Sequence, residues 1–206
     1  MKVRRAVLCV IGGVAAAGMW FGQGMAAPPG PPEGVDNPPA VVPKVDRTHN
    51  IEFLFQALKA APDDETARLI EGRIWAMWLA SGSDTADLLM SRARTAIEQN
   101  DADLAIRLLD SIIELKPDYV EAWNRRATLY FEKHDYGRAM SDIAQVLARE
   151  PRHFGALTGL GMILEDVGDN KRALEAFRRA LEVDPRLERV PEIVKTLTEK
   201  VEGRHI

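Results

Sequence analysis

The sequence has a single cysteine among its 206 residues, which excludes an internal disulfide and the cysteine-rich zinc and iron–sulfur sites. It also has no excess of basic residues, because 27 Lys and Arg stand against 31 Asp and Glu, a formal net charge of −4. A polybasic protein that binds nucleic acid or anionic lipid is therefore excluded. Apolar residues make up 46% of the chain, which is typical of a protein that buries a core.

Motifs that carry chemistry are absent as well. The sequence contains neither of the two glycine-rich phosphate-binding motifs, Gly-x-x-x-x-Gly-Lys-Ser/Thr and Gly-x-Gly-x-x-Gly. It also contains no Gly-x-Ser-x-Gly and no His-Glu-x-x-His. Each of the four histidines, at positions 49, 134, 153 and 205, lacks a second ligand at metal spacing, and we interpret them as solvated turn or tail residues. The sequence therefore predicts no enzyme, with no catalytic residue, no cofactor site and no metal site.

The first 26 residues have the three zones of a secretory signal peptide. Basic residues at positions 2, 4 and 5 precede an apolar run from Ala6 to Phe21, and small residues follow up to Ala26. This order predicts export with cleavage after Ala26. An uncleaved membrane anchor is the alternative, but the run falls short of the ~20 apolar residues that span a bilayer. A lipoprotein anchor at Cys9 is less favoured, because the residue before it is Leu8 and not a small one.

Cleavage would change the charge of the chain. It would remove Cys9 and three basic residues, leaving 24 basic against 31 acidic residues and a formal net charge of −7. The exported chain would have no thiol and no stable membrane span, and the sequence has no Asn-x-Ser/Thr sequon. We therefore expect a location in the bacterial periplasm.

Residues 27–46 are predicted to be a linker. Seven of the 12 prolines lie between positions 28 and 43. Proline fixes φ and removes a backbone donor, so this stretch is expected to be extended and solvated. A polyproline ligand for an aromatic groove is the alternative function for it.

From position 48 onward strand signals are absent and apolar residues recur at helical spacing. Proline, alanine and aspartate each recur three times at a spacing of 34 residues. The prolines are Pro117, Pro151 and Pro185, the alanines are Ala105, Ala139 and Ala173, and the aspartates are Asp101, Asp135 and Asp169. This period predicts an all-α stack of three helix-turn-helix repeats at 84–117, 118–151 and 152–185. Small residues mark the places where two helices approach closely, and the periodic prolines separate the units.

At these positions the chain resembles the tetratricopeptide repeat, whose pattern is W-x₂-L-G-x₂-Y…A-x₃-F…P. The middle unit matches at Trp123, Tyr130, Ala139 and Pro151, and the last unit matches at Leu160, Gly161, Ala173, Phe177 and Pro185. The resemblance implies a right-handed superhelical stack, and the N-terminal segment implies an exported bacterial member of the family.

Two positions depart from this pattern, because Arg92 and Arg126 stand where it has leucine. Asp142 is expected opposite Arg126 on the second helix of the unit. We therefore predict a partly buried Arg126–Asp142 ion pair with a structural role.

Both ends of the array are expected to be covered, since an end repeat otherwise exposes an apolar face. Residues 186–206 predict a capping helix and tail, with an apolar stripe at Ile193, Val194, Leu197 and Val201. Residues 47–82 predict a degenerate helical pair. We expect Trp75 and Trp78 of this pair to pack onto Leu88 or Leu89 of the first repeat, with a partner-binding role as the alternative.

Stacked first helices line a concave groove, the surface on which such repeats hold a peptide or a partner helix. Projecting positions one turn apart assigns nine residues to this groove, which are Met90, Arg94, Ile97, Asn124, Thr128, Phe131, Thr158, Met162 and Glu165. Some tetratricopeptide domains clamp a terminal carboxylate with lysine at positions occupied here by Met90 and Gly155, so that specificity is not expected.

The sequence therefore predicts a non-catalytic adaptor that binds a peptide or helix of an envelope protein. The alternative is a self-associating scaffold of the periplasm, in which the ends of the array or the N-terminal pair with Trp75 and Trp78 stack on copies of the same chain. Neither nucleic acid nor a cofactor is an expected partner, and the identity of the protein partner is left open.

Overall fold

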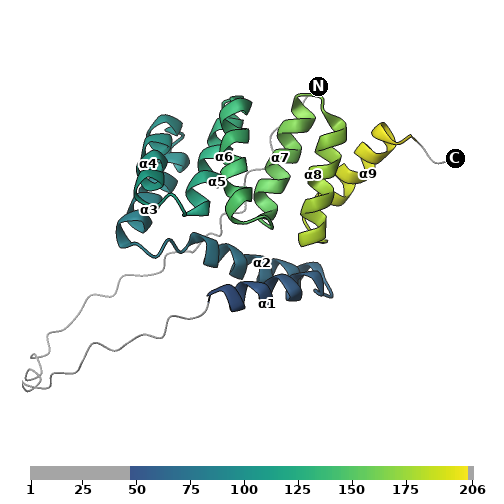
Figure 1. The fold of residues 1–206 in the computed structure, drawn as a ribbon, viewed down its shortest axis with the longest axis horizontal. Helices are drawn as coiled ribbons and strands as arrows, with labels where there is room; N and C mark the ends of the chain where they lie inside the picture. The colour runs from purple at the N-terminus through teal and green to yellow at the C-terminus, as the bar shows by residue number, and fades with distance from the viewer. Residues whose placement is uncertain (1–46, 204–206) are drawn as a thin grey trace, which may run out of the picture. The chain divides into compact units, whose positions relative to one another are not determined.

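A computed structural model of the chain describes residues 47–203, in which every regular element is an α-helix (Figure 1). No helix in that range is both long and apolar enough to cross a membrane. The predicted signal peptide at 1–26 and the linker at 27–46 lie outside the described residues, as does the end of the predicted tail at 204–206.

Six helices form three successive antiparallel pairs. They are α3 (Asp84–Glu98), α4 (Ala102–Leu115), α5 (Val120–Glu132), α6 (Tyr136–Arg149), α7 (Phe154–Asp166) and α8 (Asn170–Val183). Each odd-numbered helix packs most extensively on the helix that follows it, and the pairs stand side by side (Figure 1). The predicted all-α stack of helix-turn-helix repeats is confirmed.

The turn within each pair is built the same way three times. The residue before the second helix caps it, because its carboxylate accepts the backbone N–H three residues later at 3.0–3.2 Å. These capping residues are the periodic Asp101, Asp135 and Asp169. The residue before each cap has a positive φ, of 59° at Asn100, 57° at His134 and 84° at Gly168, which ends the first helix in the left-handed conformation.

Close helix approach within the pairs depends on the small residues. Ala105, Ala139 and Ala173 are all fully buried. At Gly161 a Cβ would lie 2.7 Å from the ring of Phe177, so only glycine allows α7 and α8 to pack at this distance.

The predicted ion pair joins the two helices of the second repeat, and its arginine also reaches the first repeat. Arg126 donates from Nε and Nη2 to the two carboxylate oxygens of Asp142, at 2.8 Å each. Its Nη1 also donates to Asp110 Oδ1 on α4 at 2.6 Å, a contact that the sequence did not predict. One guanidinium therefore links the second helices of the first and second repeats.

The C-terminal helix α9 (Val190–Val201) covers the last repeat. It packs on α8 and buries Val190 and Leu197 in a cluster that also contains Phe177. Ile193 and Val194 border the same cluster, so three of the four residues of the predicted apolar stripe face the array, whereas Val201 is 36% exposed.

The N-terminal pair consists of α1 (Arg47–Lys59) and α2 (Asp64–Leu79), and its predicted position is wrong. The pair lies across the ends of the repeat helices instead of stacking on the first repeat (Figure 1). Trp75 and Trp78 contact Phe154 at the start of α7, with ring centroids 5.4 and 5.2 Å apart. Leu88, one of the two expected contacts, is 58% exposed.

The reason lies in the polar end of the first repeat. In the later repeats, Leu129 and Ile163 are buried in the stack, with exposures of 3% and 0%. The same position of the first repeat holds Thr95, which is exposed, and Arg92 on the same stripe of α3 is exposed as well. This end tolerates water without a cap, which leaves the N-terminal pair to bury its apolar residues elsewhere.

Candidate functional site

The first helices of the repeats carry side chains that do not belong to the buried core. We call them the inner face, and each is exposed or partly exposed. Its members are Arg94, Ile97, Asn124, Thr128, Phe131, Thr158, Met162 and Glu165. All eight are among the residues that the sequence assigned to the groove, and together they offer amide, hydroxyl, thioether, aromatic and charged groups.

The ninth assigned residue, Met90, does not join them. Its side chain is 5% exposed and belongs to the apolar cluster of the first repeat, which also contains Leu109 and Tyr119. Met90 is therefore a core residue, and its predicted position in the groove is wrong.

Helix α2 covers the start of the inner face on α7. A Cβ at Gly155 would lie 2.9 Å from Cη2 of Trp75, so glycine is required for this contact. Gly155 is one turn before Thr158 on the same stripe of α7. At the start of α5, Tyr119 Oη donates to the carbonyl oxygen of Leu79 at 2.7 Å. The N-terminal pair therefore closes one end of the face.

A buried histidine lies at this junction, contrary to the solvated role expected for His153. Its ring is fully buried and stacks on Trp78, with centroids 4.1 Å apart and planes 13° apart. Nδ1 accepts the N–H of Ala156 at 3.0 Å and so caps α7. Nε2 must then carry the proton, which it donates to Glu121 Oε1 at 3.2 Å.

Glu121 connects this histidine to the inner face. The side chain is buried, yet it has partners on both sides. Asn124 Nδ2 donates to Glu121 Oε1 at 3.1 Å, and Arg125 Nε lies 3.3 Å from Oε2 in an ion pair. The histidine and Asn124 are thus held by one carboxylate, a role that the sequence did not predict for Glu121.

Two arginines, one period apart, hold the N-terminal pair on the repeats. Arg152 donates to both carboxylate oxygens of Glu52 at 2.8 and 2.7 Å, and its guanidinium lies 4.2 Å from the ring centroid of Phe55. Arg186 donates to Asp64 at 2.7 Å and to the carbonyl oxygens of residues 61 and 62 at 3.0 and 2.7 Å. Each follows a periodic proline, so the turns that follow the second and third repeats serve as docking points.

Comparison with known proteins identifies the repeat. A profile of the tetratricopeptide repeat matches residues 90–145 and 125–187. A TPR repeat-containing protein of Rhizobium etli is 44% identical over 153 residues, which cover 74% of this chain and 75% of that protein. The chain belongs to the tetratricopeptide-repeat family.

Solved tetratricopeptide domains show the same fold. The first TPR domain of Spaghetti (RPAP3), bound to the HSP90 peptide SRMEEVD, has a TM-score of 0.55 at 19% identity and covers 58% of this chain and 95% of that chain. The Sgt2 TPR domain of Aspergillus fumigatus has a TM-score of 0.54 at 22% identity, with coverages of 58% and 81%. Tetratricopeptide repeats mediate protein–protein interaction, and at these identities the likeness extends to the fold.

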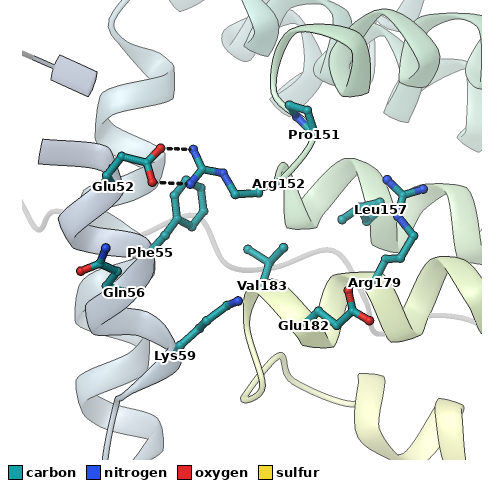
Figure 2. Close-up of a pocket in the computed structure, with 10 residues that line it drawn as sticks. All are labelled: Glu52, Phe55, Gln56, Lys59, Pro151, Arg152, Leu157, Arg179, Glu182 and Val183. Carbon is teal, nitrogen blue, oxygen red and sulfur yellow. Dashed lines mark hydrogen bonds and ion pairs between the residues drawn. The ribbon is translucent and has the colours of Figure 1, made fainter. Parts of the chain in front are cut away.

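A cavity of about 360 Å³ lies between α1 and the third tetratricopeptide repeat (Figure 2). Its apolar lining comes from Phe55, Leu157 and Val183, and the paired Glu52 and Arg152 form one wall. The remaining lining residues are Gln56, Lys59, Pro151, Arg179 and Glu182. The cavity follows from the way α1 rests on α7 and α8, and it lies apart from the inner face.

A pair of neighbouring carboxyl groups, Glu71 and Asp184, lies between α2 and the turn after α8. Burial and the neighbouring Asp184 carboxylate raise the pKa of Glu71 to about 7, and burial also raises the pKa of Asp184. Asp184 Oδ1 accepts the N–H of Arg186 at 3.0 Å, while Oδ2 is buried. The two carboxyl groups therefore retain a proton between them near neutral pH.

Among residues 47–203, no three histidine, cysteine, aspartate or glutamate side chains are grouped as a metal site would require.

Proposed function

We propose that this chain is a non-catalytic adaptor of the bacterial envelope, which holds a peptide or helix of another exported protein on its inner face. The observation that carries the proposal is the partly exposed Phe131, which lies between Asn124 and Thr128 on α5 and the polar turn that follows. An aromatic ring flanked by amide and hydroxyl groups suits a peptide bound through both its backbone and its side chains.

Two further features support the proposal. The solved Spaghetti domain, which has the same fold, holds a short peptide. The first 26 residues have the organisation of a signal peptide, which favours a periplasmic location. Self-association through the open end of the array is disfavoured, because Arg92 and Thr95 make that end polar.

The test is capture of envelope proteins on the immobilised chain, followed by binding measurements with each purified protein retained. Asn124→Ala combined with Phe131→Ala should abolish binding while the melting temperature changes little. The matched control is Leu115→Ala with Gln145→Ala, on α4 and α6, which should bind as the unaltered chain does. Equal retention of the partner by the inner-face double variant would sink the proposal.

A further inference from the structure

The inner face is open along only part of its length. On α5 its first turn is occupied by the buried Glu121, and on α7 its first turn lies under Trp75. On α3, Met90 is buried one turn further along, at the position that Asn124 and Thr158 occupy in the later repeats. Ligand contacts therefore begin at Asn124 and Thr158 and extend over the second halves of the three helices.

Each of these second halves ends on an acidic side chain at the repeat period. The residues are Glu98, Glu132 and Asp166, all exposed, and Glu165 stands beside the last. Arg94 is the basic member of the face, and the nearby Lys133 already donates to Asp103 at 2.8 Å. The C-terminal ends of three helices add partial negative charge at the same place. The open half of the face is thus electronegative.

Aromatic rings lie among these carboxylates. Phe131 and Tyr136 have ring centroids 6.0 Å apart. Tyr136 Oη donates to Asp166 Oδ2 at 3.0 Å, which connects the ring at the start of α6 to the end of α7. Since that hydroxyl is a donor, His134 Nδ1 donates to Tyr136 Oη at 2.9 Å. Aromatic faces beside carboxylates are the surroundings that a guanidinium or ammonium group prefers.

Glu132, next to Phe131, fits the same chemistry. Although Glu132 is exposed, partial desolvation by its neighbours raises its pKa. The free energy cost of desolvating this carboxylate would be offset by a cation brought by a ligand.

We infer that the partner segment is basic, and that one of its lysine or arginine side chains lies against Phe131 and Tyr136 between Glu132 and Asp166. Its apolar side chains contact Ile97 and Met162 on either side. This inference rests on the proposed function, because it assigns the chemistry of the ligand to the same inner face.

The test selects ligands without assuming a sequence. A phage-displayed library of random 12-residue peptides is selected on the full chain, and the enriched peptides are synthesised for anisotropy measurements at low and high salt. We expect basic peptides whose affinity falls as salt rises. Glu132→Gln with Asp166→Asn should weaken binding about tenfold or more. The matched control, Glu114→Gln with Glu175→Gln, neutralises two exposed carboxylates elsewhere and should stay within about twofold.

The outcomes separate the two ideas. The inference of a basic partner segment would be overturned if the enriched peptides were acidic or neutral. It would also be overturned if they bound the Glu132→Gln and Asp166→Asn double variant as tightly as the unaltered chain. The proposed function would stand in that case if Asn124→Ala with Phe131→Ala still abolished binding. Failure to enrich any peptide, or binding that ignores the Asn124 and Phe131 substitutions, would refute both.

Discussion

Replacing Asp142 with alanine should destabilise the array by about 2–3 kcal/mol, because Arg126 loses its main partner. The Asp142 side chain is 5% exposed and accepts two hydrogen bonds of 2.8 Å. Removing one member of a buried ion pair costs roughly 3–5 kcal/mol. Arg126 keeps its bond to Asp110 and is itself 16% exposed, which places the expected loss at the lower end of that range or just below it.

The assay compares Asp142→Ala with Asp110→Ala by thermal and urea unfolding. Asp110 is 43% exposed and accepts a single bond, so its loss should cost about 1 kcal/mol or less. A loss of 2–3 kcal/mol lowers the melting temperature of a chain this size by about 5–10 °C. Circular dichroism and fluorescence are recorded together, since repeat arrays unfold in parts.

A rescue variant sharpens the same test. Arg126→Leu restores the leucine of the family pattern but leaves Asp142 buried without its cation, so it should destabilise on its own. Adding Asp142→Ala to it should recover most of the loss, because an apolar pair replaces a buried ion pair at little cost. An Asp142→Ala variant that melts like the unaltered chain, or no more easily than Asp110→Ala, would refute the reasoning.

Three further predictions concern packing, docking and pH. Gly161→Ala should lower the free energy of unfolding in urea by about 1–3 kcal/mol, because the new Cβ would lie 2.7 Å from the ring of Phe177. Gly159→Ala is the control and should be neutral or stabilising, because its nearest contact would be at 3.7 Å. Arg186→Ala should loosen the N-terminal pair and shift the fluorescence of the α2 tryptophans to longer wavelength, and an unshifted spectrum counts against the docking role. The pKa of Glu71 is raised to about 7 from 4.5, so the folded state binds more protons between these values. Stability should therefore fall by about 1–2 kcal/mol as pH rises from about 4.5 to about 7. Glu71→Gln should flatten that dependence in melts between pH 5 and pH 8.

The helices of the repeats were predictable because their signals are local and recur. Asp101 and its two periodic counterparts cap the second helices, and each periodic proline separates one unit from the next. The Arg126–Asp142 pair was predictable for a related reason. An arginine at a core position of one helix needs a carboxylate on the helix that packs against it, and the antiparallel pair leaves few candidates.

His153 escaped prediction because its sequence neighbourhood is that of a turn. Its burial depends on Trp78 and Glu121, which belong to two other helices. The period does hold a signal, since Tyr119 stands 34 residues earlier and is also buried. Tyr119 and His153 place a large ring at the same position of two successive turns, whereas the first repeat has Thr85 there. This difference indicates that another element packs on the later two turns and not on the first.

The same comparison between repeats explains the position of the N-terminal pair. The turns after Pro151 and Pro185 begin with Arg152 and Arg186, which bind Glu52 and Asp64. The turn after Pro117 begins with an acidic residue, Asp118, which could not bind those carboxylates. Charge in the turns thus directs α1 and α2 to the second and third repeats, and the polar stripe of α3 gives them no apolar surface at the first. Helical periodicity cannot reveal this, because it compares residues along one helix, whereas docking of the pair depends on differences between repeats.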